Sequence, residues 1–161
     1  FFQADDGIRD FCLSRGLGDV YKRQDITVSA GAQSAPIAFG EAGVAPSEID
    51  VAMIYDSFSI TVLTLLEDLG FCSKGEGGPW VSGGKLRFDR PNDGPAINTD
   101  GGGLSSNHPG MRGIFLLIEA VRQMRGESHS QVEGAKLAVA HGNGGMLGAR
   151  HSAATIILAR D

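Results

Sequence analysis

Hydrophobic residues recur at two spacings along the chain, and the two patterns alternate. Short apolar runs bounded by turn residues are typical of buried strands, whereas longer segments repeat their apolar residues at helical spacing. Helices are predicted over residues 34–44, 57–69 and 109–125, and strands over residues 49–54, 135–140 and 154–158. This order of elements predicts an α/β fold with a mixed sheet packed by helices.

Each predicted helix has its own pattern. The first has Ser34 as a candidate N-cap and ends at Gly43. The second is apolar nearly all round, so we expect it to be buried. The third begins at Pro109, a residue favoured in the first helical turn. Its predicted apolar stripe consists of Ile114, Leu117, Ile118, Val121 and Met124.

Two segments carry no clear period. Residues 1–24 show neither a helical nor a strand pattern, and the stretch CLSRGLGDVYKRQ resembles translated adapter sequence. We therefore expect residues 1–24 to be partly an artefact or a poorly ordered extension, and residues 25–161 to form the domain. Residues 73–103 are rich in glycine and proline, and a loop of this length is usually functional or takes part in dimerisation.

Composition narrows the class of protein. The 161 residues suffice for one domain, and 42% hydrophobic and 20% charged residues are typical of globular proteins. No apolar run approaches the roughly 18 residues of a membrane-spanning helix, and the net charge of −5 argues against nucleic-acid binding. Cys12 and Cys72 form neither a disulfide framework nor a zinc site, so we expect a reducing, cytoplasmic location. The 24 glycines are clustered beside polar and reactive residues.

The first candidate site is Tyr55-Asp56-Ser57-Phe58, between a predicted strand and the following helix. Ligands of open α/β sheets bind at the carboxyl ends of strands. Asp56 and Ser57 would equally serve as helix caps. Tyr55 has a hydroxyl that needs a hydrogen-bond partner wherever it is buried.

The second candidate site is His108, which follows a run of glycines and precedes the third predicted helix. A neutral imidazole at a helix N-terminus, where backbone N–H groups favour negative charge, donates a hydrogen bond to an oxyanion. The alternative is a histidine satisfied by local backbone groups.

The third candidate site is HGNGG, residues 141–145, between the last two predicted strands. Glycines allow backbone N–H groups to approach a ligand closely. A hairpin turn at Asn143-Gly144 explains the same residues, and the pattern alone favours the turn. The spacing of the histidines does not match a metal site, so we expect no metal.

Taken in this order, the three segments resemble the C-terminal half of a thiolase, from about Ser34 to Arg160. The strongest stretches are YDSFSITVLTLLEDLGFCSKGEGGPWV, INTDGGGLSSNHPGMRG with IEAVRQMRGE, and AHGNGGMLG. The most similar branch contains acetyl-CoA acetyltransferases and the sterol carrier protein and nonspecific lipid-transfer thiolases. The resemblance implies an incomplete thiolase-type layered α/β fold, with the N-terminal half missing. It also implies a further strand, central in the sheet, which residues 1–24 do not clearly supply.

The resemblance implies roles for the first two sites. His108 matches the histidine that supports the catalytic cysteine of thiolases and helps to bind the thioester oxygen. Tyr55 takes the place of an asparagine that positions an oxyanion-hole water, and Asp56 is expected to bind substrate beside it. The nucleophilic cysteine lies in the missing half, because neither Cys12 nor Cys72 matches it.

For the third site, the resemblance implies proton transfer and a second oxyanion hole. His141 takes the place of the second catalytic cysteine, and an imidazole titrates near neutrality. The backbone N–H of Asn143, with Gly144 beside it, would complete the oxyanion hole.

These roles lead to a first hypothesis and two alternatives. The first is the C-terminal part of an acyl-CoA C-acyltransferase that handles CoA thioesters by Claisen or retro-Claisen chemistry. The alternatives are a retro-aldolase for β-hydroxyacyl-CoA of the steroid side-chain type, with Tyr55 as acid or base, and a lipid- or CoA-binding scaffold without turnover. CoA would be a substrate rather than a bound cofactor, and the fragment alone is expected to be inactive and poorly stable.

The resemblance also implies partners. We expect a homodimer that works with a small protein containing a zinc ribbon and an OB fold, and we expect the zinc to lie in that partner. Neither a nucleic acid nor a membrane is expected as a partner.

Overall fold

The computed structural model describes residues 8–17, 26–82, 84–87, 89, 94–106, 110–145 and 152–160. Its strands are β1 (Ile8–Leu17), β2 (Val51–Ile54), β3 (Ala96–Ile97), β4 (Leu137–Gly144) and β5 (Ser152–Arg160). Its helices are α1 (Gly31–Ala42), α2 (Ser59–Asp68), α3 (Gly77–Val81) and α4 (Arg112–Arg125), with a 3-10 turn at Pro46–Glu48.

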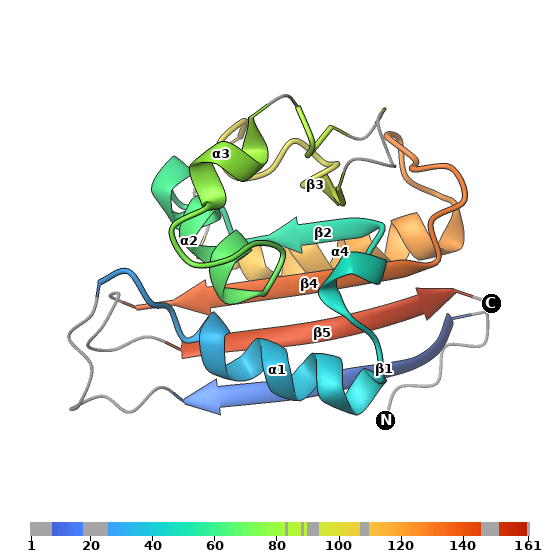
Figure 1. The fold of residues 1–161 in the computed structure, drawn as a ribbon. Helices are drawn as coiled ribbons and strands as arrows, with labels where there is room; N and C mark the ends of the chain where they lie inside the picture. Colours follow the sequence, from blue (N-terminus) through green and yellow to red (C-terminus); the bar gives the residue numbers. More distant parts are fainter. Residues whose placement is uncertain are drawn as a thin grey trace.

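The strands form one mixed sheet in the order β1-β5-β4-β2-β3 (Figure 1). β2 runs parallel to β3 and β4, whereas β5 runs antiparallel to both β4 and β1. The predicted α/β class with a mixed sheet is therefore confirmed.

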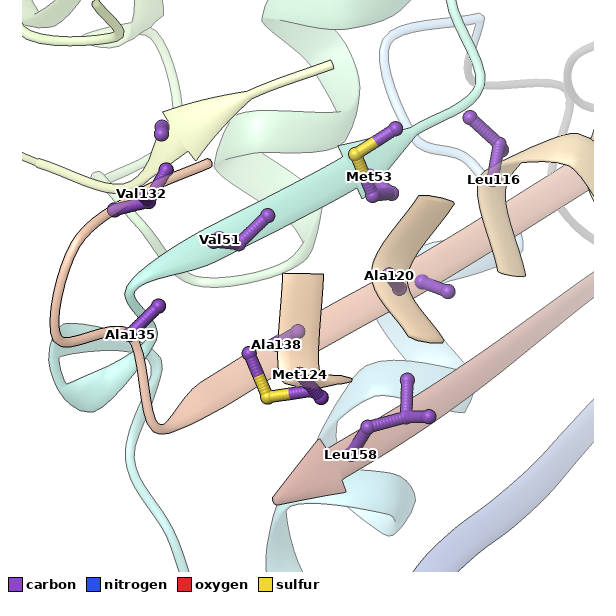
Figure 2. Close-up of a cluster of buried hydrophobic side chains, with 11 residues drawn as sticks. Val51, Met53, Leu116, Ala120, Met124, Val132, Ala135, Ala138 and Leu158 are labelled. Carbon is purple, nitrogen blue, oxygen red and sulfur yellow. The ribbon is translucent and has the colours of Figure 1, made fainter. Parts of the chain in front are cut away.

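Helices cover both faces of the sheet (Figure 1). On one face, α1 lies over β5 and β1, and α2 packs beside it; on the other face, α4 lies over β4 and β2. Each face has its own apolar core, and Figure 2 shows the core between α4 and the sheet, to which β2, β4 and β5 all contribute. The core on the α1 face contains Ala35, Ala38, Ile54, Leu65, Val139 and Ile157, among others.

Residues 8–17 form a strand that the sequence pattern did not predict. β1 pairs along its length with β5, so the strand that precedes the first helix lies at the edge of the sheet. The expectation of no element in residues 1–24 is therefore wrong for residues 8–17, whereas the central strand that the resemblance implies stays a prediction.

The first predicted helix begins earlier than expected. α1 starts at Gly31, so Ser34 lies inside the helix and is buried rather than capping it. The Ser34 hydroxyl instead bonds to the Thr155 hydroxyl of β5 at 2.8 Å. The predicted end is confirmed, because Gly43 caps the helix with a left-handed φ of 68°.

α4 confirms only part of the predicted stripe, because Met124 is buried and Leu117 and Val121 are partly buried against the same core. Leu116, Ala120 and Met124 are buried in its core, whereas Ile114 is 49% and Ile118 40% exposed. Two apolar stripes share this helix, and spacing alone does not say which one faces the sheet. The second helix also departs from the prediction, because Ile60 at its start is exposed.

The loop-rich segment over residues 73–103 contains two short elements within its described part. α3 packs on α2, and the two residues of β3 pair with β2. The last two strands are longer than predicted, so Asn143 and Gly144 belong to β4, where they pair with Ala153 and Ser152. The prediction of a hairpin turn at Asn143-Gly144 is therefore wrong.

Candidate active site at the ends of β2 and β4

The first and third candidate segments lie side by side. Ile54 pairs with His141 in the parallel β2–β4 ladder, and the backbone N–H of Tyr55 donates to the carbonyl of His141 at 3.0 Å. The carboxyl ends of both strands thus meet at one edge of the sheet, where ligands of open α/β sheets bind.

Asp56 holds the glycine-rich loop that follows β3. Its buried carboxylate accepts the backbone N–H of Gly103 at 2.8 Å and of Leu104 at 3.0 Å. A Cβ at Gly102 would overlap the Asp56 carboxylate, so the loop requires glycine there. Asp56 is not a helix cap, since Phe58 occupies the N-cap of α2 and makes no side-chain cap bond. Substrate binding by Asp56 stays a prediction.

Asn98 fastens the start of the same loop to β2. Its side-chain oxygen accepts the N–H of Ile54 at 2.8 Å, and its side-chain nitrogen donates to the Ile54 carbonyl at 2.9 Å. Asn98 has a φ of 45°, a left-handed value that asparagine tolerates better than most residues. The sequence analysis missed this contact, which has no local signal because 44 positions separate the two residues.

An ion pair between the buried Arg112 guanidinium and the partly exposed Asp100 carboxylate joins the loop to α4. The Arg112 Nη2 lies 3.0 and 2.9 Å from the two carboxylate oxygens of Asp100, which also accepts the N–H of Gly102. Asp56, Asn98 and Asp100 therefore fix the loop from three sides. His108 lies outside the described residues, between this loop and α4, and its predicted role stays a prediction.

Tyr55 packs against the core beneath α4 and is partly buried. Burial and the negative charge of Asp56 raise the pKa of Tyr55, and the positive charge of Arg112 opposes this rise. The phenol is thus held in its neutral form near pH 7, in which it donates a hydrogen bond.

His141 lies on the other face of the sheet. It follows Val139 by two residues on β4, so its side chain points to the same side as Val139, toward α1. The ring is completely buried, its Nδ1 lies 2.8 Å from the Thr155 hydroxyl, and a Cβ on Gly31 would lie 3.2 Å from it. An acid/base role for His141 stays a prediction, and this burial speaks for a structural one.

A pocket of about 880 Å³ lies on the opposite face, between α4 and the ends of β4 and β5. Its walls consist mostly of small and apolar residues, with Asn143 and Ser152 as polar groups. The backbones of β4 and α4 approach each other here, because a Cβ on Gly142 would lie 3.5 Å from the Gly113 Cα, in van der Waals contact. Asn143 and Gly144 line this pocket, as an oxyanion-binding role requires, and that role stays a prediction.

Among the described residues, no group of three or more histidine, cysteine, aspartate or glutamate side chains is arranged to hold a metal ion. In the same part of the chain, no helix has the length and apolarity needed to cross a bilayer.

Comparisons with known proteins agree with the fold. The chain is 41% identical over 129 residues to an acetyl-CoA acetyltransferase of Methanothermobacter thermautotrophicus, covering 78% of this chain and 33% of that protein. It is 39% identical over 144 residues to sterol carrier protein 2 of Oryctolagus cuniculus, covering 88% of this chain and 25% of that protein. The chain thus spans a third or less of the length of these two curated relatives.

Among solved structures, the chain is similar to an "Ltp2-ChsH2(DUF35) aldolase", with a TM-score of 0.78 and 28% identity. This match covers 93% of this chain and 38% of that one. A model of the family described as thiolase C-terminal domain-like matches residues 17–160. The chain belongs to this thiolase C-terminal domain-like family.

Proposed function

We propose that the protein is a thiolase-type acyl-CoA C-acyltransferase that makes or breaks a carbon–carbon bond beside a CoA thioester. The observation that carries this proposal is the convergence of Tyr55, the loop clamped by Asp56 and the N-terminus of α4 at the ends of β2 and β4. Claisen chemistry places negative charge on a thioester oxygen, and preorganised donors at such an edge stabilise that charge.

In this proposal, donors on this chain bind the thioester oxygen. His108, just before α4, would donate one hydrogen bond, and the neutral Tyr55 hydroxyl would donate another. Removal of one such donor typically costs about 3 kcal/mol of transition-state stabilisation. The acyl group would be carried by a cysteine outside this chain.

The residues of β4 divide between two proposed tasks. Asn143 and Gly144, which line the pocket, would bind the second oxyanion. His141 would move a proton only if its ring turned from the α1 face toward the pocket. As observed, the ring holds the end of β4 in place through Thr155.

The experiment is transfer of a labelled acetyl group from acetyl-CoA to the complete protein that contains this domain. Wild-type protein should become labelled, and His108→Ala should lose most of the labelling rate. Exposed His129 offers a matched control, and His129→Ala should label like the wild type. Binding of acetyl-CoA without any labelling would favour a CoA-binding scaffold instead.

A second candidate function is retro-aldol cleavage of a β-hydroxyacyl-CoA, and it is favoured by Tyr55 at the strand end. This role requires the minor, ionised form of Tyr55, because its raised pKa keeps the phenol neutral near pH 7. That tyrosinate would take the proton of the β-hydroxyl while the Cα–Cβ bond breaks, which releases a carbonyl compound and leaves the enolate of the shortened thioester. The neutral tyrosine would then return the proton to Cα. The solved structure most pertinent here is named an aldolase.

One variant distinguishes the two proposed reactions. Tyr55→Phe keeps the ring and removes the hydroxyl, so a retro-aldolase should lose nearly all activity. An acyltransferase with His108 as the second donor should retain measurable thiolysis.

Partners follow from the same comparison. We propose a homodimer and a complex with a DUF35-type protein, because the similar aldolase is named with such a component. Light scattering of the complete protein, alone and with a co-purified partner, tests both assemblies.

A further inference from the structure

The floor of the pocket on the α4 face consists of paired residues of β4 and β5. The three cross-strand pairs are Ala140 with Ile156, Gly142 with Ala154, and Gly144 with Ser152. Ala140 and Ile156 pack on the core beneath α4, and the other two pairs follow at intervals of two residues, so all three pairs lie on this face. Glycine and alanine have almost no side chain, and the floor therefore leaves a space beside α4.

The roof and the inner end of the pocket are aliphatic. Ile114 and Leu117 of α4 form the roof. Further along β5, Leu158 belongs to the buried core shown in Figure 2, so the pocket ends at Leu117 and Ile156, which are partly buried against that core. Among the described residues that line the pocket, none carries a charge. Ile114 is 49% exposed, and an aliphatic side chain so exposed at a pocket wall favours an apolar ligand.

The pocket adjoins the candidate active site. Ile54 of β2 pairs with His141 of β4, and the next residues along the two strands are Tyr55 and Gly142. Gly142 thus lies beside Tyr55 at the carboxyl ends of the strands, and it also lines the pocket. A thioester bound at these strand ends would have the pocket within reach of its acyl chain.

The size of the pocket bears on the length of that chain. An acetyl group has three heavy atoms, each about as large as a water molecule of roughly 30 Å³, and would fill on the order of a tenth of the 880 Å³. We propose that the pocket binds the acyl chain of the substrate, and that the substrate is a CoA thioester of a medium or larger apolar acyl group, linear or polycyclic. This inference rests on the proposed function in taking a CoA thioester as the ligand. Acetyl-CoA is then the smaller of the two thioesters that the reaction joins or releases.

The experiment measures binding, by calorimetry, to the complete protein that contains this domain. The probes are the CoA thioesters of acetate, octanoate, dodecanoate and a steroid carboxylic acid. Each methylene that leaves water tightens binding by up to about fourfold, so octanoyl-CoA should bind at least about thirtyfold more tightly than acetyl-CoA. The dodecanoyl and steroid thioesters distinguish a linear from a polycyclic acyl group.

Two variants on the floor should change this preference in opposite directions. Ala154→Val fills the middle of the pocket, so it should reduce the preference for octanoyl-CoA over acetyl-CoA at least about tenfold and leave acetyl-CoA binding unchanged. Ile156→Ala opens the inner end and should shift the preference from octanoyl-CoA toward dodecanoyl-CoA. Ala159→Val is the matched control, because Ala159 points toward the α1 face, and it should keep the wild-type preference.

The proposal is overturned by equal affinities for acetyl-CoA and octanoyl-CoA. It is equally overturned if Ala154→Val weakens both thioesters to the same extent, because the pantetheine arm or another part of the complete protein would then fill the pocket. If Ile156→Ala does not fold, Ile156→Val and Ala154→Val still decide. Binding needs no turnover, so a chain-length preference without acetyl labelling would contradict the proposed reaction alone, and failure to bind any of these thioesters would contradict both proposals.

Discussion

The two faces of the sheet treat polar groups in opposite ways. On the α1 face, His141, Thr155 and Ser34 are completely buried and form a continuous chain of hydrogen bonds. On the α4 face, the pocket is lined mostly by glycine, alanine and aliphatic residues, among them Gly142, Gly144 and Ala154. One strand, β4, contributes alternate residues to both faces.

This difference shows how a strand divides structural from functional residues. Successive side chains of β4 point to opposite faces, so a change of one position decides whether a group is enclosed or reaches a ligand. The resemblance implies a catalytic role for His141, which stays a prediction, whereas the ring itself is completely buried on the α1 face. The functional residues are therefore expected on the α4 face and at the strand ends.

The largest effect is expected at Gly102, which lies against Asp56 at the edge of the α4 face. Gly102→Ala would force a Cβ into the Asp56 carboxylate and require a non-glycine residue at a φ of 68°. We expect the free energy of unfolding to fall by about 3 kcal/mol or more, since the loop must also give up bonds to Asp56. Denaturant titration measures this change.

Gly43 provides a matched control for that variant. It has the same φ of 68°, and a Cβ there would meet nothing within 4 Å. Gly43→Ala should therefore cost only the backbone strain, about 1 kcal/mol. Equal losses at the two glycines would show that the Asp56 clamp does not constrain the loop.

On the α1 face, His141→Ala tests whether the ring belongs to the core. The variant would leave a cavity and deprive Thr155 of one of its two hydrogen-bond partners, so the free energy of unfolding should fall by about 2 to 3 kcal/mol. His129→Ala removes an exposed ring and should change stability by less than about 0.5 kcal/mol. A His141→Ala protein as stable as the wild type would place the ring outside the core and restore its candidacy for proton transfer.

The sequence predicted the elements better than it predicted which way they face. The strand over residues 49–54 and the ends of α1 and α4 follow from apolar runs and terminal glycines. The buried stripe of α4 does not, because Ile114 and Ile118 are as apolar as the residues that pack on the sheet. β1 was missed, because residues 1–24 show no apolar alternation and its pairing with β5 joins segments far apart in the sequence.

The same division holds for the candidate site. Tyr55 and Asp56 were recognisable because they directly follow a strand, where ligand-binding residues gather. Asn98, Asp100 and Arg112 were missed, because their contacts join distant segments and have no local signal. The direction of the His141 ring depended on the register of β4, which the resemblance to a thiolase did not supply.

The pocket on the α4 face is tested by filling it from β5. Ala154 lines the pocket, so Ala154→Leu should weaken the binding of a medium-chain acyl-CoA at least tenfold, or about 1.4 kcal/mol. Ala159 lies on the same strand and points toward the α1 face, so Ala159→Leu should bind like the wild type. Calorimetry gives both dissociation constants, and equal weakening by the two variants would show that the ligand does not enter the pocket.

The smallest effect is expected at Glu67, which lies on α2, beside α1. Burial opposes its ionisation, but the N–H groups of Gly75 and Gly77 and the ammonium of Lys74 outweigh burial and lower the pKa of Glu67. A lowered pKa contributes stability above the ordinary value of 4.5, and this contribution is lost as the pH falls through the folded-state value. Glu67→Gln should therefore cost about 1 kcal/mol at pH 7 and almost nothing at low pH, as denaturant titrations at both values would show. The control is the same substitution at the exposed Glu41. A loss of stability in Glu67→Gln that persisted at low pH would indicate lost packing rather than lost charge.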